Sequence, residues 1–240
     1  MIPLSVVAAL VCLTGCGITK EYHQTYAFPP DGRIYLETVT GGAQIVGWDR
    51  NEVQVSVIAK SNRSEDLQNT EIRIETDADS MRLWTDAVEV SAGSDAASAH
   101  PGGPANVQYI LSVPRGISFE RIEVFDSSLD ITGVRGSIRA RVRNGDIRAS
   151  FDELGDTATT VSLETLGGAI SVRFPYRPDV RLDAHSSRGT IESDFGIPMR
   201  STLPNGGEFS DVREIVGAGR VRVRLYATDG SVTIRQAPPL

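Results

Sequence analysis

The chain has 240 residues, of which 40% are hydrophobic, 23% charged and 6% aromatic, a globular composition that excludes intrinsic disorder. Its 23 glycines and 12 prolines follow no three-residue period, which excludes a collagen-like fibre. With 24 Lys and Arg against 31 Asp and Glu, the formal net charge is -7. This sign argues against nucleic acid or an anionic bilayer surface as the main partner.

The first predicted element is a targeting segment. The run IPLSVVAALVCL from Ile2 to Leu13 is uncharged and matches a signal-peptide hydrophobic region, because it is well short of the roughly 20 residues that span a bilayer. It leads into Leu13-Thr14-Gly15-Cys16, which resembles the lipobox of bacterial lipoproteins. That resemblance implies a signal peptide over 1–15 and a lipid on Cys16. No Lys or Arg precedes Cys16, which leaves open a start codon further upstream.

The two cysteines support export with a lipid anchor. Cys12 lies within the predicted signal peptide, so Cys16 is the only thiol expected in the mature chain and no disulfide can form. The resemblance to lipoproteins implies the bacterial cell envelope, and Gly17 in place of Asp favours the outer membrane, on its periplasmic face or at the cell surface. Several acyl chains on one residue would anchor the protein stably. Residues 16–30 are predicted to be a tether.

From Gly32 onwards the chain alternates apolar and polar residues, as half-buried strands do. Examples are Val53 to Val57, Val107 to Val113, Ile138 to Val142 and Val221 to Leu225. No stretch of a dozen residues keeps a helical period, although 61–70 and 210–216 are each long enough for a turn or two of helix. The pattern predicts an all-β fold.

A recurring unit refines this fold class: a strand ends in a polar turn with glycine, and Ile or Val opens the next strand. Gly145, Gly168, Gly189 and Gly230 mark four such turns, separated by 23, 21 and 41 residues. A period of about 21 residues is typical of a β-solenoid, a β-helix-like stack of short strands. The alternative is a β-sandwich, whose hairpins also recur at short intervals. We expect one solenoid domain over 31–240.

Two segments interrupt the period. Residues 91–106 contain thirteen Ala, Ser, Gly or Pro among sixteen, so this stretch is predicted to be a flexible insertion with little to bury. Residues 196–219 are predicted to be an irregular insertion that replaces one coil. Insertions in repeat proteins often carry binding surfaces.

Two motifs resemble the bacterial putative-adhesin family of exported β-solenoid domains of unknown function. The first is GAQIVGWDRNEVQV over 42–55, and the second is the closing ladder that ends in GAGRVRVRLYATDGSVTI over 217–234. The resemblance covers about 33–236. It implies a solenoid fold and an envelope location, and it says little about mechanism.

The sequence offers no assembled catalytic or metal site. Aspartates lie mostly beside Gly or Ser in turns, where their side chains bond to nearby backbone amides; they are Asp126, Asp130, Asp146, Asp194 and Asp229. The three histidines, His23, His100 and His185, are far apart in the sequence and define no metal site. No nucleophile elbow or dinucleotide motif is present. We therefore predict a non-enzyme without metal or cofactor.

One surface feature stands out. Arg139, Arg141 and Arg143 alternate with the apolar residues of one strand, and Arg220, Arg222 and Arg224 repeat the pattern. The rows either pair with carboxylates of neighbouring coils, such as Glu164, Glu192 and Asp183, or bind anionic groups of envelope glycans. Arg139, Arg141 and Arg143 are the candidate anionic-ligand residues.

The sequence thus predicts a lipid-anchored, non-enzymatic envelope β-solenoid that presents an interaction or adhesion surface. Its expected partners are the membrane, through Cys16, and an envelope glycan or protein, with no nucleic acid. The alternative is a carbohydrate-active β-helix enzyme, which would need two carboxylates, or a carboxylate and a base, facing one cleft.

Overall fold

The computed structural model describes residues 10–13, 18–87, 105–155, 159–202 and 208–239, and in these residues almost all regular structure is β-strand. Two sheets of ten strands each form the body. The predicted all-β, solenoid-like class is confirmed.

The strands of sheet A, in spatial order, are β1 (Leu10–Leu13), β2 (Ile18–Ala27), β5 (Glu52–Ser61), β8 (Asn106–Pro114), β4 (Ala43–Trp48), β10 (Leu129–Thr132), β12 (Ile147–Ser150), β14 (Ile170–Phe174), β20 (Val232–Gln236) and β16 (Ile191–Ser193). Those of sheet B are β17 (Met199–Thr202), β18 (Glu208–Val216), β15 (Val180–Ser186), β19 (Val221–Asp229), β13 (Thr160–Gly167), β11 (Ile138–Asn144), β9 (Ser118–Val124), β3 (Arg33–Thr38), β7 (Ser80–Ala87) and β6 (Thr70–Thr76). A single short helix, α1 (Ser64–Gln68), occurs in the described residues.

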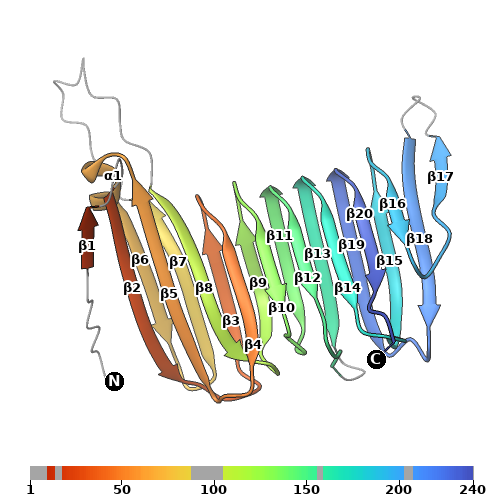
Figure 1. Cartoon of the computed structure of the whole chain (residues 1–240), viewed down its shortest axis with the longest axis horizontal. Coiled ribbons are helices and arrows are strands. Elements are labelled where there is room, and N and C mark those ends of the chain that lie inside the picture. Colours follow the sequence, from red (N-terminus) through yellow and green to blue (C-terminus); the bar gives the residue numbers. More distant parts are fainter. Residues whose placement is uncertain (1–9, 14–17, 88–104, 156–158, 203–207, 240) are drawn as a thin grey trace.

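The two sheets form two layers along the long axis (Figure 1), and from β8 to β16 the chain alternates between them, one strand in each. Most neighbouring strands of the central coils run parallel and in register, so that Leu129, Ile147, Ile170 and Val232 form one inward row. These residues are fully buried between the layers. A single apolar core therefore runs through the stack, as a solenoid requires.

The spatial order of the coils differs from their order in the sequence. In sheet B, β19 lies between β13 and β15, and in sheet A, β20 lies between β14 and β16 (Figure 1). The coil built from β19 and β20 is thus inserted between two coils that precede it in the chain. The interval of 41 residues between Gly189 and Gly230 therefore does not mark a missing coil, because these two turns are direct neighbours.

The segment 196–219, expected to be an irregular insertion, is partly regular. Its strands β17 and β18 pair antiparallel, and β18 pairs antiparallel with β15 over seven residues. This hairpin extends sheet B beyond β15, so it adds to one layer and does not replace a coil. It also contains 210–216, which is strand and not helix, whereas the possible helical turn at 61–70 is present as α1.

The expected tether at 16–30 is also different in the structure. Residues 18–27 form β2, which pairs antiparallel with β5 over ten residues. Ile18, Tyr22 and Tyr26 lie on one face of the strand and pack partly buried against the core. The alternation is weak in this part of the sequence, because Gln24, which shares the face of Tyr22 and Tyr26, is polar like most residues of the opposite face.

The predicted flexible insertion at 91–106 lies outside the described residues, except for its last two positions. Ala105 is buried and its backbone N-H donates to the Thr70 hydroxyl at 2.9 Å, while Asn106 begins β8. Cys16 also lies outside the described residues. Within the described ranges, no helix has the length and apolar character needed to cross a bilayer.

Candidate interaction surface

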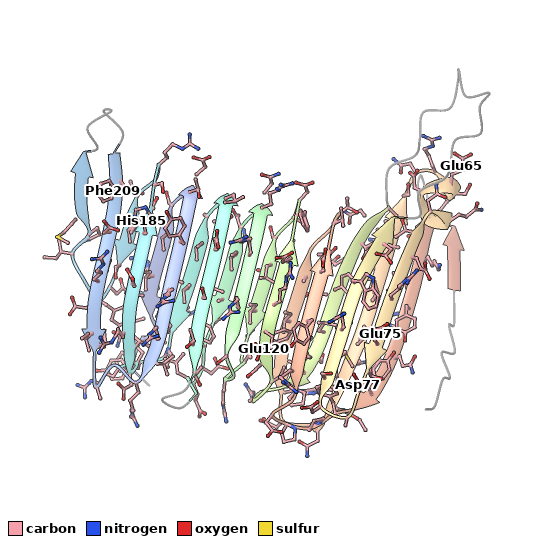
Figure 2. The ribbon with its side chains drawn as sticks, turned by 180° about the vertical axis from the view of Figure 1, so that it is seen from behind. Glu65, Glu75, Asp77, Glu120, His185 and Phe209 are labelled. Atoms are coloured by element: carbon pink, nitrogen blue, oxygen red, sulfur yellow. The ribbon has the colours of Figure 1, made fainter. Side chains whose placement is uncertain are left out.

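The outer face of sheet B carries many exposed charged side chains. Alternation along each strand buries Ile138, Ala140 and Val142 and leaves Arg139, Arg141 and Arg143 exposed, as predicted. Because the strands are in register, outward residues of neighbouring strands form rows across the sheet. Figure 2 views the molecule from this side, with His185 and Phe209 toward one end and Glu75 toward the other.

The three arginines predicted to bind an anion have different surroundings. Arg141 donates from Nε and Nη2 to one carboxylate oxygen of Glu164, at 3.1 and 2.9 Å. The Arg143 guanidinium lies 5.5 Å from the ring centroid of Phe125, a cation-π contact. Among the described residues, no carboxylate lies within ion-pair distance of Arg139. The predicted pairing with a neighbouring coil therefore holds for Arg141, and Arg139 is the member of the row left open to a ligand.

Three further arginines lie close to Arg139 in the grid of strands. Arg222 on β19 is directly opposite Arg181 on β15, and Arg224 is opposite Ser162 of β13 on its other side. Ser162 is in turn opposite Arg139. We call the set of Arg139, Arg181, Arg222 and Arg224 the arginine patch. All four side chains are exposed, and no described carboxylate pairs with any of them.

The carboxylate nearest to the patch, that of Asp183, forms its ion pair outside the patch. Asp183 is opposite Arg224 on one side and Arg213 on the other, and its ion pair, at 3.5 Å, is with Arg213. Thirteen other arginines of the described residues form ion pairs with Asp or Glu. Four more of the described arginines, Arg82, Arg143, Arg173 and Arg177, form none, so the patch is set apart by the close grouping of its members on one face.

A second cluster lies beside the patch, around His185 on β15. Its Nδ1 is 2.7 Å from Oδ1 of Asp211 on β18, and its Nε2 is 3.1 Å from Oγ of Ser187. The ring stacks on Tyr226 of β19 at 4.8 Å between centroids and lies 5.7 Å from the ring of Phe209 (Figure 2). These contacts fix the imidazole and join three strands. The cluster lines a shallow hollow that also includes Glu164, Asp183, Arg213 and Arg224.

The turn aspartates make the contacts that a structural role predicts. Oδ1 of Asp146 accepts the backbone N-H of Ala169 at 2.9 Å, and Oδ2 of Asp194 accepts that of Gln236 at 2.9 Å. This hydrogen bond and the neighbouring Arg235 lower the pKa of Asp194. The remaining contacts are Asp126 with Asn144, Asp130 with Arg148, and Asp229 with Arg188. The expected bonding to backbone amides is therefore seen for Asp146 and Asp194, whereas the other three contact side chains, and Asp130 lies within strand β10.

The other histidines take no part in the His185 cluster. His23 lies on β2, where Nδ1 is 2.9 Å from the Ser56 hydroxyl, and His100 lies outside the described residues. Over the part of the chain that the structure describes, no three His, Cys, Asp or Glu side chains come close enough together to hold a metal ion.

Sequence reasoning missed Arg181 and the His185 cluster. Arg181 lies in a short alternating strand that gave no run of arginines, and its neighbours depend on the insertion of β19 between β13 and β15. Asp211 reaches His185 only because 208–216 is a strand paired with β15. The alternation Val180, Leu182 and Ala184 was the one signal that placed Arg181 and His185 on the outer face.

Comparison with solved structures supports the fold. A crystal structure from Clostridium sporogenes ATCC 15579, titled a putative cell adhesion protein, superposes with a TM-score of 0.56 at 13% identity, covering 91% of this chain and 100% of that one. A putative adhesin from Bacteroides fragilis NCTC 9343 covers 91% of this chain and 97% of its own at 11% identity, but its TM-score of 0.29 is too low to bear on the fold. No curated protein matches.

A family model matches the part of the chain that carries the parallel coils and the arginine patch. It covers residues 116–235, half of the chain, from the end of β8 to β20. The same region contains the stacked glycine turns and the inserted coil. The chain therefore belongs to the Toastrack DUF4097 family.

Proposed function

We propose that this protein is a non-enzymatic, lipid-anchored component of the bacterial cell envelope that presents the outer face of sheet B as an interaction or adhesion surface. The proposal rests on the ordered rows of charged and aromatic side chains on this face. The rows form because a continuous buried core holds the strands of sheet B in register. A rigid sheet presents such groups at fixed spacing, which lowers the entropic cost of binding.

The similar structure from Clostridium sporogenes adds support for an adhesion role, since it has this fold and is titled a putative cell adhesion protein. At 13% identity the likeness concerns the fold, and the adhesion role is part of our proposal for this chain.

The lipid anchor is proposed from the lipobox-like Leu13-Thr14-Gly15-Cys16. Strand β2 begins at Ile18, so the folded body would start two residues after the lipidated Cys16. Removal of residues 1–15 would also remove β1 and leave β2 at the edge of sheet A. The anchored end of the solenoid would then lie next to the membrane, on the periplasmic face of the outer membrane or at the cell surface.

One observation favours a second candidate function, hydrolysis of an ester on an envelope glycan. The sequence of contacts from Asp211 to His185 to Ser187 has the partners of a Ser-His-Asp triad, with the carboxylate on Nδ1 and the hydroxyl on Nε2. Acyl transfer also needs donors for the developing oxyanion. The backbone N-H groups of Ser187 and Arg188 donate to carbonyls of β19 at 2.9 and 3.0 Å, so these two are occupied. Because these two donors are already occupied, the geometry favours the non-enzymatic proposal over the hydrolase.

The test uses the full chain purified in detergent and incubated with isolated envelope fragments from the producing bacterium. We expect retention of envelope material with no release of soluble product, measured by sedimentation and by chromatography of the supernatant. Release of acid or sugar that is abolished by Ser187→Ala would establish the hydrolase instead. Absence of both retention and release would overturn the surface function.

The anchor is tested separately in cells, because retention of envelope fragments does not depend on it. Wild type and Cys16→Ser are expressed at equal levels and compared by membrane fractionation, with a further cysteine variant, Cys12→Ser, as the matched control. We expect only Cys16→Ser to leave the membrane fraction.

A further inference from the structure

The arginine patch brings like charges together, and none of its four members forms an ion pair with a described carboxylate, because the neighbouring Asp183 pairs with Arg213. Arg181 and Arg222 are directly opposite each other on adjacent parallel strands, and Arg224 lies on the same face two residues after Arg222. A guanidinium stays protonated at all ordinary pH values, so it cannot relieve repulsion by losing a proton. Like charges in opposite positions of a sheet are destabilising. The arrangement therefore has a cost in the free protein that an anion would remove.

The rest of the outer face shows that the sheet can accommodate arginines with partners. Arg141, two residues after Arg139 on β11, pairs with Glu164, and Arg213 on β18 pairs with Asp183. These two pairs lie beside the patch and use the carboxylates nearest to it. Among the described residues, the arginine patch is therefore an unpaired cationic area, bordered by Glu164 and Asp183, in a chain whose net charge is -7.

The dimensions of this zone limit what it can bind. It extends over β11, β13, β19 and β15, three strand intervals of about 4.8 Å, or roughly 14 Å. Along the strands, Arg222 and Arg224 are separated by about 7 Å. A linear polymer with an anionic group every one or two units fits a strip of this size. A single phosphate would reach only two of the four guanidinium groups.

Neighbouring side chains favour a sugar polymer over other polyanions. Tyr226 follows Arg224 by two residues on the same outer face and is 46% exposed, so part of its ring is open to stack on a sugar. The Ser162 hydroxyl lies in register between Arg139 and Arg224 and offers a donor and an acceptor. A nucleic acid would bring many more phosphates than four arginines can neutralise, against an overall negative charge.

We propose that the arginine patch binds a polyanionic polysaccharide, through forked contacts of the guanidinium groups with its carboxylate, sulfate or phosphate groups. This inference rests on the proposed function of the sheet B face and names its ligand class. The proposed site keeps Arg139 of the predicted row. It omits Arg141 and Arg143, which have partners within the protein, and adds Arg181, Arg222 and Arg224.

The test measures binding of the full chain, purified in detergent, to immobilised polygalacturonate and dextran sulfate, with neutral dextran as the uncharged probe. The triple variant Arg181→Ser, Arg222→Ser, Arg224→Ser is compared with Arg33→Ser, Arg148→Ser, Arg235→Ser, which removes the same charge from arginines that have ion partners. We expect the first to weaken binding to at least one acidic probe by at least about tenfold and the second to change it by less than about threefold. Binding of the unmodified chain should fall as salt rises, and the fall should be shallower in the patch variant.

Folding is controlled by the thermal unfolding transition of each variant, and a second variant, with Lys at the same three patch positions, keeps the charge and loses the fork. The Lys variant should bind more weakly than wild type and more tightly than the Ser variant. Equal losses in the patch and control variants, or no binding to either acidic probe, would overturn the assignment. Tighter binding of a single-stranded oligonucleotide than of both polysaccharides would overturn the glycan class.

The outcomes separate this inference from the proposed function. If the patch variant retains envelope fragments as well as the unmodified chain does, the surface function stands and the patch assignment fails. If acidic polysaccharide binds through the patch but envelope fragments are not retained by any form, the patch stands and the envelope surface function fails.

Discussion

Replacement of Gly168 by alanine tests the stacked turns that define the coils. Gly168 has φ +147°, and a Cβ built on it would lie 2.1 Å from the carbonyl oxygen of Gly145 in the coil below. The next turn repeats the contact, because a Cβ on Gly230 would lie 1.8 Å from the carbonyl oxygen of Gly168. These glycines therefore let consecutive turns approach more closely than any other residue would allow.

The expected cost has two parts. A residue other than glycine at this φ carries backbone strain of about 1–3 kcal/mol. Relief of the overlap requires two backbone segments to separate by about 1 Å, and overpacking of this kind costs about 1–3 kcal/mol more. Together they predict that Gly168→Ala lowers the free energy of unfolding by about 2–6 kcal/mol. For a chain of this size that corresponds to a melting temperature lower by roughly 4–24 °C.

The matched control is the preceding residue, Gly167. A Cβ there would come no closer than 3.3 Å, to the side-chain oxygen of Asn144, which can move. We expect Gly167→Ala to change the free energy of unfolding by less than about 1 kcal/mol. Urea and thermal unfolding of both variants, followed by circular dichroism, measure the difference. A loss below about 1 kcal/mol for Gly168→Ala, or equal losses in the two variants, would refute the stacked-turn reasoning.

Three further predictions concern the anchor, the core and a buried tyrosine. Cys16→Ser should abolish lipid labelling, because a hydroxyl does not form the thioether; palmitate incorporation that persists would contradict the lipoprotein interpretation. Val142→Asp should prevent folding, since it buries an unpaired carboxylate, whereas Arg141→Ala should cost less than about 1 kcal/mol, because the ion pair it removes is exposed; similar unfolding curves would contradict the assigned faces. Burial raises the pKa of Tyr109 to about 12, so the native state keeps this proton in a range where the unfolded chain loses it. Stability should therefore fall between about pH 10 and 12, by up to about 1.4 kcal/mol per pH unit, and Tyr109→Phe should make the fall shallower in unfolding measurements.

The strands and the faces of the central coils were readable from the sequence. Alternation placed Ile138, Ala140 and Val142 inside and the arginines outside, and that assignment is confirmed by burial. The recurring glycine turns predicted the stack, because positive φ and close backbone approach are needed at Gly168. These are local properties, and each is determined by a few consecutive residues.

The order in which coils stack is a property of long-range pairing, and the pattern along the chain does not carry it. A parallel strand of the form Val-Arg-Val-Arg-Leu fits equally well beside several neighbours, since each offers the same alternation. The hairpin of β17 and β18, and strand β2 next to the edge of sheet A, were missed for a related reason. They lie at the ends of the sheets, where partial burial weakens the apolar period that a central strand shows.

The insertion of β19 between β13 and β15 links the fold to the proposed binding surface. In a stack that followed the sequence, β15 would pair with β13, and Arg181 would lie next to Thr160 instead of Arg222. The observed order places Arg222 and Arg224 in the middle of the patch, with Arg181 on one side and Arg139 two strands away on the other. It also gives the C-terminal strands partners on both sides, so the end of the chain is held within the stack. The like-charged neighbours therefore arise from the coil order, and their arrangement is as rigid as the core beneath them.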